Sequence, residues 1–192
     1  MKRFILVLSA FMLMLCVCAC DDTPSSSSAE KSLDEIIESV KIEAKKTYGD
    51  SSSVDVKSQM RESYKWVAKN VRYKNIAVDL SNGYTAELVD ELAKYSFSYR
   101  NGSCEHVAAT LYKLFESVGA EPIMVDGERL DSGTNEWGAH AWVIAKVDGK
   151  YYHFDPLFAR NHTPDYMSMF MAKDSDIEAT HKWDRKAYPV CD

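Results

Sequence analysis

Three residues whose side chains suit acyl transfer occur one after another in the second half of the chain. Cys104 lies in Asn-Gly-Ser-Cys-Glu-His, His140 in Gly-Ala-His-Ala-Trp, and Asp155 in Tyr-Tyr-His-Phe-Asp-Pro. A cysteine sulfur can attack a carbonyl carbon, an imidazole can take the thiol proton, and a carboxylate can orient the imidazole. The three residue types therefore predict a cysteine-dependent enzyme that transfers acyl groups.

Cys104 is expected to be the first residue of a helix, directly after Ser103, a residue type that favours the N-cap. Free backbone N–H groups and the positive end of the helix dipole stabilise a thiolate there and can bind an oxyanion. We therefore expect the pKa of Cys104 to lie below that of a free thiol. Two other interpretations stay open: a buried structural cysteine, and a disulfide with Cys191, since proteins outside the cytosol often carry disulfides.

His140 and Asp155 are expected on two paired strands. The Asp148-Gly149 dipeptide between them is a strong signal for a two-residue hairpin turn. A hairpin closed there places Asp155 opposite Trp142, so His140 lies diagonal to Asp155 on one face of the sheet and within side-chain reach. The aspartate would then hold the histidine ring in the tautomer that accepts the cysteine proton.

Two further residues are expected to shape a substrate pocket. Gly102, without a side chain, lets a substrate approach the backbone near Cys104. Trp142 lies two residues after His140, on the same strand face, and is expected to form a wall of the pocket.

The remaining histidines are not expected to act in the chemistry. His106 should point away from Cys104 on its helix, and His153 is expected to be a paired core histidine. His162 and His181 lack the spacing to a cysteine or acid that is typical of metal ligands. We therefore predict no metal and no cofactor.

The distribution of apolar residues predicts helices first and an antiparallel sheet afterwards, which is an α+β fold. The fourth helix carries a broad apolar stripe and is expected to be buried at the centre of the domain. The expected helices span residues 32–46, 56–71, 85–95 and 104–118, and the expected strands span 122–126, 139–147 and 151–155.

The chain also resembles a known family. Residues from about 64 to 160 look like the transglutaminase-like superfamily, whose members share a papain-like fold. The resemblance rests on Gly-Ser-Cys104 opening a helix, on the His140-Ala-Trp strand and on the Tyr-His-Phe-Asp155-Pro strand. It implies a papain-like or transglutaminase-like core, with N-terminal helices and a central helix packed on an antiparallel sheet. It also implies Cys104 as nucleophile, His140 as base and Asp155 as orienter. The closing residues 176–189 are similar to the tail of secreted bacterial members.

The first thirty-one residues look like an export signal and a tether. Lys2 and Arg3 precede an apolar run over residues 4–17, which is short for a spanning helix. Val-Cys-Ala-Cys20 then resembles a bacterial lipobox with Cys20 as the lipidated residue. We expect a signal peptide over 1–19, a flexible tether over 20–31 and a transglutaminase-like domain over 32–192. This places the domain at the cell membrane, lipid-anchored on its extracytoplasmic face. An uncleaved membrane anchor and a cleaved form without lipid stay open as alternatives.

The overall charge limits the partners. The chain has 192 residues and a formal net charge of −6, whereas a nucleic-acid surface calls for a basic face. We expect a monomer that acts on a protein, peptide or cell-wall substrate and binds no nucleic acid. Hydrolysis of a peptide or amide bond is favoured over protein cross-linking, because an amine acceptor must outcompete water at about 55 M. The alternatives are cross-linking, a non-catalytic binding module and a structural domain with a Cys104–Cys191 disulfide.

Overall fold

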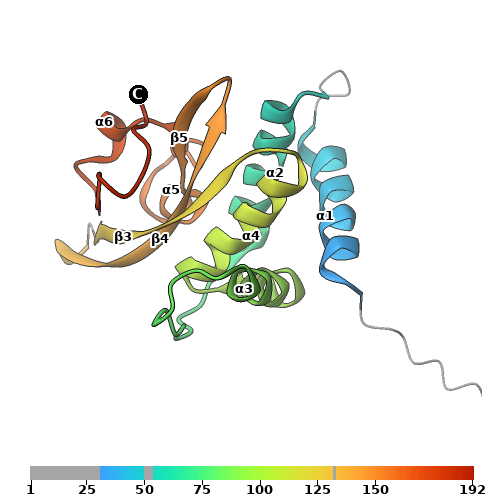
Figure 1. Cartoon of the computed structure of the whole chain (residues 1–192), viewed down its shortest axis with the longest axis horizontal. Coiled ribbons are helices and arrows are strands. Elements are labelled where there is room, and N and C mark those ends of the chain that lie inside the picture. The colour runs from blue at the N-terminus through green and yellow to red at the C-terminus, as the bar shows by residue number, and fades with distance from the viewer. Residues whose placement is uncertain (1–30, 50–53, 132) are drawn as a thin grey trace, which may run out of the picture. The chain divides into compact units, whose positions relative to one another are not determined.

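Helices make up the first half of the described chain (Figure 1). The computed structural model describes residues 31–49, 54–131 and 133–192. Its first four helices are α1(Leu33–Tyr48), α2(Val56–Asn70), α3(Ala86–Tyr99) and α4(Cys104–Ser117). Side-chain caps mark where the first three begin: Ser32, Asp55 and Thr85 each accept a backbone N–H three residues ahead. Such caps satisfy N–H groups that the helix itself leaves without a partner.

Strands dominate the second half and form one antiparallel sheet in the order β6-β5-β4-β3-β7. The strands are β3(Pro122–Asp131), β4(Glu136–Val147), β5(Lys150–Phe154), β6(Phe170–Ala172) and β7(His181–Trp183). The short helices α5(Pro156–His162) and α6(Asp174–Ile177) lie between the last strands, and β1(Arg72–Tyr73) pairs in parallel with β2(Asn101–Gly102). The predicted α+β fold is confirmed.

The β4–β5 hairpin has the predicted register, with Val143 opposite Phe154 and Ile144 opposite His153. Asp148 and Gly149 both have positive φ, 52° and 84°. A two-residue hairpin turn of the type that matches the strand twist needs this conformation at both positions. The register follows from the turn, and it sets where the ends of β4 and β5 meet.

The central helix α4 packs on the face of the sheet formed by Ala141, Val143 and Ala145, within the main buried cluster. Figure 1 shows α4 between the sheet and α1, with α2 and α3 on its flanks. Phe115 of α4 meets Phe154 of β5 edge to face, with ring centroids 4.9 Å apart. The expected central helix on an antiparallel sheet is therefore confirmed.

The other face of β4 carries Trp142 and Ile144, which form a second buried cluster with Val125 and Cys191. The chain after β5 contributes to this side through Trp183 and Tyr188. The strand β7 pairs with β3 at Gly127, where any side chain would meet the Lys182 carbonyl oxygen and the Trp142 ring.

The strand β3 is longer than predicted, since it continues from Asp126 to Asp131. Its extra residues pair with β4 and with β7, where Arg129 lies opposite His181. The partner strand β7 lies some fifty residues later in the chain, so local pattern in β3 does not reveal the extension. The extension carries Arg129 to the site described below.

The predictions for residues 1–30 lie outside the described residues. They comprise the signal peptide, most of the tether and the lipidated Cys20. The described residues fall within one compact unit, Lys31–Asp192. Across the described part of the chain, we find no helix with the length and apolar character needed to cross a membrane.

Candidate active site

Cys104 is the first residue of α4, as predicted, but Ser103 does not cap this helix with its side chain. The Ser103 hydroxyl instead lies 2.8 Å from His106 Nδ1 and bonds to the Glu105 carboxylate. His106 also fills the space beside Gly102, where a Cβ would come within 2.3 Å of the His106 Cβ. Gly102 therefore makes room for this packing, and the expectation that it lets a substrate approach the backbone stays a prediction.

The Cys104 thiol does not have the lowered pKa expected from its helix position. Burial, and next the Glu105 carboxylate, raise the pKa of Cys104 to about 12. The sulfur lies 3.4 Å from Glu105 Oε2 and donates its proton there. Hydrogen bonds from the backbone N–H groups of Ala141 and Glu105 lower the pKa of Cys104, but by less than burial and Glu105 raise it. The resting group is thus a thiol, because removing its proton would leave a buried anion beside a carboxylate.

His140 and Asp155 form a buried pair. His140 Nε2 lies 2.6 Å from Asp155 Oδ2, and both side chains are 1% exposed. Burial acts to raise the pKa of Asp155, but His140 and His181 outweigh it and hold this pKa below its ordinary range. The carboxylate is therefore ionised and accepts the Nε2–H, which leaves a lone pair on His140 Nδ1. Within the described residues, Nδ1 has no hydrogen-bond partner.

Asp155 is held from three sides. Its Oδ1 accepts the backbone N–H of Phe158 at 2.8 Å and so caps α5, while Oδ2 also lies 3.2 Å from His181 Nε2. His181 comes from β7 and is fully buried, with Thr180 Oγ1 2.9 Å from its Nδ1. The sequence analysis considered His181 only as a metal ligand and did not predict its contact with Asp155. The only signal for its importance was the similarity of residues 176–189 to the tail of secreted bacterial proteins.

Trp142 packs against the His140 ring and does not line the cavity that contains Cys104 and His140, although it was expected to form a pocket wall. The two rings stack with centroids 5.9 Å apart and planes 22° apart, and Trp142 is 1% exposed. Its indole N–H donates to His153 Nδ1 at 2.9 Å. Trp142 therefore fixes the orientation of the His140 ring through packing, and a substrate outside the sheet does not reach it.

A cavity of about 80 Å³ brings Cys104 and His140 together. Apart from these two residues, the sequence analysis did not assign any of the lining residues to the site. The lining residues are Tyr73, Cys104, Arg129, Ala139, His140, Leu157, Phe158, Asn161 and His162. The proposed nucleophile and the proposed base therefore line the same small cavity.

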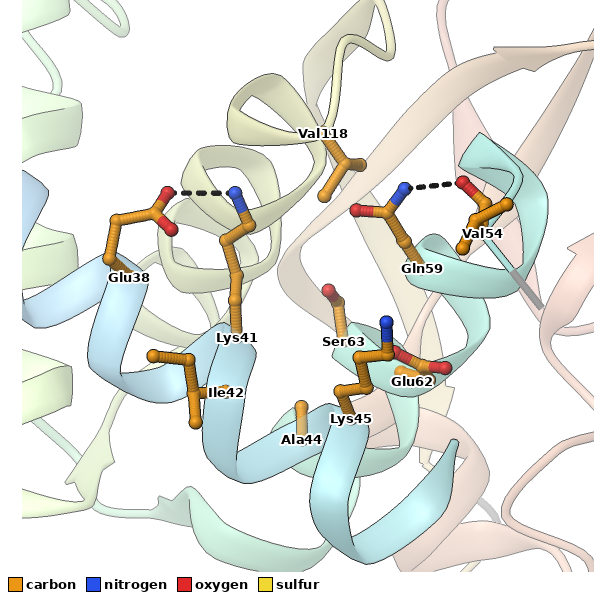
Figure 2. Close-up of a pocket in the computed structure, with 10 residues that line it drawn as sticks. All are labelled: Glu38, Lys41, Ile42, Ala44, Lys45, Val54, Gln59, Glu62, Ser63 and Val118. Atoms are coloured by element: carbon orange, nitrogen blue, oxygen red, sulfur yellow. Dashed lines mark hydrogen bonds and ion pairs between the residues drawn. The ribbon is translucent and has the colours of Figure 1, made fainter. Parts of the chain in front are cut away.

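A larger cavity, about 230 Å³, lies between α1 and α2 and is shown in Figure 2. Its charged groups are acids and lysines, among them Glu38 and Lys41, which pair at 2.7 Å. No cysteine or histidine is among its lining residues. The candidate active site is therefore not the larger of these two cavities.

Two groups of side chains among the described residues have donor atoms close enough for a metal ion, within 4.8 Å of one another. In the group of His153, Asp174 and Cys191, His153 Nδ1 accepts the Trp142 N–H, so the ring proton is on Nε2 and points to Asp174. That nitrogen has no lone pair for a metal. In the group of His140, Asp155 and His181, a metal would have to displace both hydrogen bonds to Asp155. The absence of a metal remains a prediction.

Cys104 and Cys191 are both free thiols in the structure. They belong to different buried clusters, Cys104 with α4 and Cys191 with Trp142. The alternative of a structural Cys104–Cys191 disulfide is therefore contradicted.

The site and fold agree with a known family. The family model described as the transglutaminase-like superfamily matches residues 40–156. This range covers more than half of the 192 residues, and the chain therefore belongs to the transglutaminase-like superfamily. The matched range includes Cys104, His140 and Asp155 and ends before His181. Among curated proteins, none matches the chain.

Solved structures that match parts of the chain are distant in sequence. A protein from Cytophaga hutchinsonii, proposed to be a cysteine protease, is 19% identical over 67% of this chain, with a TM-score of 0.44. A transglutaminase is 13% identical over 71% of this chain, with a TM-score of 0.47. An arylamine N-acetyltransferase from Bacillus cereus, described with a Cys-His-Glu triad, is 13% identical over 67%, with a TM-score of 0.46. The chain covers 39%, 34% and 50% of these three proteins, respectively.

Proposed function

We propose that this protein transfers acyl groups through a thioester on Cys104 and hydrolyses peptide or amide bonds. The observation that carries the proposal is the 2.6 Å contact between His140 Nε2 and Asp155 Oδ2. It places the free lone pair on Nδ1 of a ring that lines the same cavity as the Cys104 thiol. A base with a fixed tautomer beside a nucleophile is the arrangement that covalent acyl transfer requires.

The first half-reaction forms the thioester. The Cys104 sulfur attacks the carbonyl carbon as His140 Nδ1 takes the thiol proton, so the thiol need not ionise beforehand. The negative charge of Asp155 stabilises the imidazolium that results. His140 then gives this proton to the leaving amine, the carbon–nitrogen bond breaks, and the acyl group remains on sulfur.

The second half-reaction returns the enzyme to its starting state. Water attacks the thioester carbonyl and gives a proton to His140 Nδ1. The carbon–sulfur bond breaks, the carboxylic acid leaves, and the proton returns to the sulfur. Transfer to an amine would follow the same steps with the amine in place of water. Water is the favoured acceptor, because an amine must outcompete water at about 55 M.

Trapping the acyl-enzyme tests this proposal. The full-length protein is mixed with p-nitrophenyl acetate and with a panel of peptide thioesters, and peptide mass spectrometry locates the acyl group. We expect acylation at Cys104, none in Cys104→Ala and much slower acylation in His140→Ala. Adding a labelled primary amine separates hydrolysis from cross-linking by the product formed. If no probe acylates folded wild-type protein, the chain is a binding module and the enzymatic proposal is wrong.

We further propose that the domain is lipid-anchored through Cys20 at the extracytoplasmic face of the cell membrane, where it meets protein, peptide or cell-wall substrates. An added diacylglycerol and N-acyl chain would supply the two or more chains that stable anchoring needs. Cys20→Ser should abolish incorporation of labelled fatty acid, whereas Cys16→Ser and Cys18→Ser should retain it. Lipid incorporation in Cys20→Ser would show that the anchor lies elsewhere.

A further inference from the structure

One permanently charged cationic side chain, that of Arg129, lines the cavity at Cys104. Arg129 is the only arginine or lysine among the described residues that line it. The strand register explains its place: Arg129 lies opposite Gly138 on β4 and opposite His181 on β7, two residues along β3 from the partner of His140. Three strands therefore hold the backbone of Arg129 next to the proposed base.

Among the described residues, only Asp131 pairs with the Arg129 guanidinium, and this contact is long. Arg129 Nη1 lies 3.5 Å from Asp131 Oδ2, at the outer limit of a hydrogen bond. The other oxygen of Asp131 accepts the backbone N–H groups of Gly133 and Thr134 at 2.9 and 3.2 Å, so its loop holds this carboxylate. A guanidinium has five N–H donors, and most of those of Arg129 are left for a ligand. The Arg129 side chain is 27% exposed, which leaves it partly shielded from water.

The surrounding charges make Arg129 the attractive side of the cavity for an anion. On the side of Glu105, a carboxylate bonds to the Cys104 sulfur and repels negative groups. His162 adds no second positive charge, because burial, and next the charge of Arg129, lower its pKa. The whole chain carries a net charge of −6. At the cavity, an anionic group is therefore favoured near Arg129 and disfavoured near Glu105.

We infer that Arg129 binds a carboxylate of the acyl substrate, so that the substrates are peptides or amides with a free carboxylate close to the scissile carbonyl. This inference rests on the proposed acyl transfer at Cys104 and names its substrate class. Arginine pairs with carboxylates through two parallel hydrogen bonds, which fixes position as well as charge. Arg129 and Cys104 both line this small cavity of about 80 Å³. A carboxylate bound by Arg129 would therefore lie close to a carbonyl group at the sulfur.

Alkylation of Cys104 by iodoacetate and by iodoacetamide tests the inference without a known substrate. Both reagents form the same bond, from the Cys104 sulfur to a methylene carbon, and both release iodide; they differ mainly in the negative charge. The ratio of the two rate constants at one pH cancels the thiolate fraction, and peptide mass spectrometry separates Cys104 from other cysteines. We expect Arg129→Gln to lower the iodoacetate-to-iodoacetamide ratio by about three- to tenfold, the size of a single charge interaction across several ångströms of partly solvated protein.

Matched variants make the result specific. Arg129→Lys should retain part of the ratio, because it keeps the charge and loses the fork of donors. Arg129→Glu should lower it further than Arg129→Gln. Lys57→Gln removes a cation near Asp148, at the opposite end of the β4–β5 hairpin, and should leave the ratio unchanged. An equal drop in Lys57→Gln would mean that net charge, and not Arg129, attracts the anion, and the inference would be overturned.

A binding measurement gives a second readout that needs no reactive thiol. In Cys104→Ala, N-acetylglycine should bind more tightly than the neutral N-acetylglycinamide in an NMR titration, with shifts around Tyr73 and Ala139. Adding Arg129→Gln should abolish this difference. If the difference is absent and the alkylation ratio does not respond to Arg129, the inference is wrong. The acylation of Cys104 by ester probes is a separate outcome, so the proposed function can survive that failure.

Discussion

Trp142 contacts the histidines of two sets of cysteine, histidine and aspartate. The two sets differ in whether the histidine Nδ1 has a hydrogen-bond partner. The first set is Cys104, His140 and Asp155, and the second is Cys191, His153 and Asp174. In both sets the histidine Nε2 contacts a carboxylate oxygen, at 2.6 Å in the first and 2.8 Å in the second. Trp142 stacks on the first histidine and donates its N–H to Nδ1 of the second.

This difference separates a candidate base from a structural histidine. His153 uses both ring nitrogens inside the protein and is fully buried. His140 uses Nε2 only, and its ring lines a cavity. The right residue types and short distances are present in both sets. Only the set with an unused lone pair at a cavity can accept a proton from a nucleophile.

The two cysteines show that the resting pKa does not make this distinction. Burial is the main cause that raises the pKa of each thiol to about 12, with Glu105 adding to it for Cys104 and Asp174 for Cys191. Cys191 is 1% exposed and packs in an apolar cluster, whereas Cys104 is 9% exposed and lines the cavity. Exposure to a cavity that the His140 ring also lines, and not acidity, sets Cys104 apart.

Replacing each cysteine by alanine in turn should give the largest difference between the two sets. Cys104→Ala should abolish acylation by p-nitrophenyl acetate, because the attacking atom is gone. Cys191→Ala should leave the acylation rate within about twofold and cost roughly 1 kcal/mol of stability through lost packing. Stopped-flow release of p-nitrophenol measures both rates. Loss of acylation in Cys191→Ala, with the fold intact by circular dichroism, would reverse the assignment of the two sets.

Replacing each aspartate by asparagine should give the next largest difference. Asp155→Asn favours the wrong histidine tautomer, and the corresponding change in a serine protease lowers kcat about 10⁴-fold. We expect a loss of about 10³- to 10⁴-fold in Asp155→Asn and less than about tenfold in Asp174→Asn, since His153 takes no part in proton transfer. Equal losses in the two variants would show that the aspartates act through stability alone.

Asp155→Asn also tests the lowered pKa of Asp155 through the pH dependence of stability. Because the pKa of Asp155 is lowered in the folded protein, its ionised form contributes stability above its unfolded pKa, and this contribution disappears as the pH falls through the folded value. The unfolding free energy of wild type should therefore drop on acidification more steeply than that of Asp155→Asn. Urea titrations from neutral to acidic pH give the slopes, and parallel slopes would contradict the lowered pKa.

Glu105→Gln should produce a smaller change, confined to the first set. Removing the negative charge beside the sulfur stabilises the thiolate, so the pKa of Cys104 should fall from about 12 and alkylation at neutral pH should rise by about tenfold. Glu116→Gln, at the other end of α4, is the control and should not change the profile. The measurement is the pH dependence of iodoacetamide labelling at Cys104. An unchanged profile in Glu105→Gln would leave burial as the whole cause.

Trp142→Phe should have the smallest effect on chemistry and a visible one on stability. The change removes the hydrogen bond to His153 Nδ1 and part of the packing under His140, at a cost of about 1–3 kcal/mol. Acylation should fall less than in Asp155→Asn, because the contact between His140 and Asp155 remains. Denaturant unfolding and acylation rates measured together test this order, and a loss as large as that of Asp155→Asn would make Trp142 part of the proton-transfer machinery.

Much of the fold follows from short-range features of the sequence. The Ser32 cap, the Asp148-Gly149 turn and the apolar stripe of α4 each depend on residues within a few positions of one another, and the structure has all three. The hairpin turn also sets the register, and the register brings His140 within reach of Asp155. The contact between these two residues was therefore predictable from the sequence.

Other features depend on segments that meet only in the folded chain. The sequence alone does not reveal that His181 and Arg129 lie next to each other at the site, because β7 returns to the edge of β3 from far along the chain. It also does not reveal that Trp142 faces inward to His153, or that His106 fills the space beside Gly102. These are packing outcomes of the whole domain.

The clearest division between sequence and tertiary structure lies in Cys104 itself. The sequence by itself determined that Cys104 begins a helix, because its position follows from the turn before it and the apolar pattern after it. Only the tertiary structure decided its acidity, since burial is the sum of contacts from α4, β4 and the chain after β5. A helix start stabilises a thiolate by a local and modest amount, whereas burial beside the Glu105 carboxylate destabilises it by more. The larger of these two opposing effects is the one that the sequence does not display.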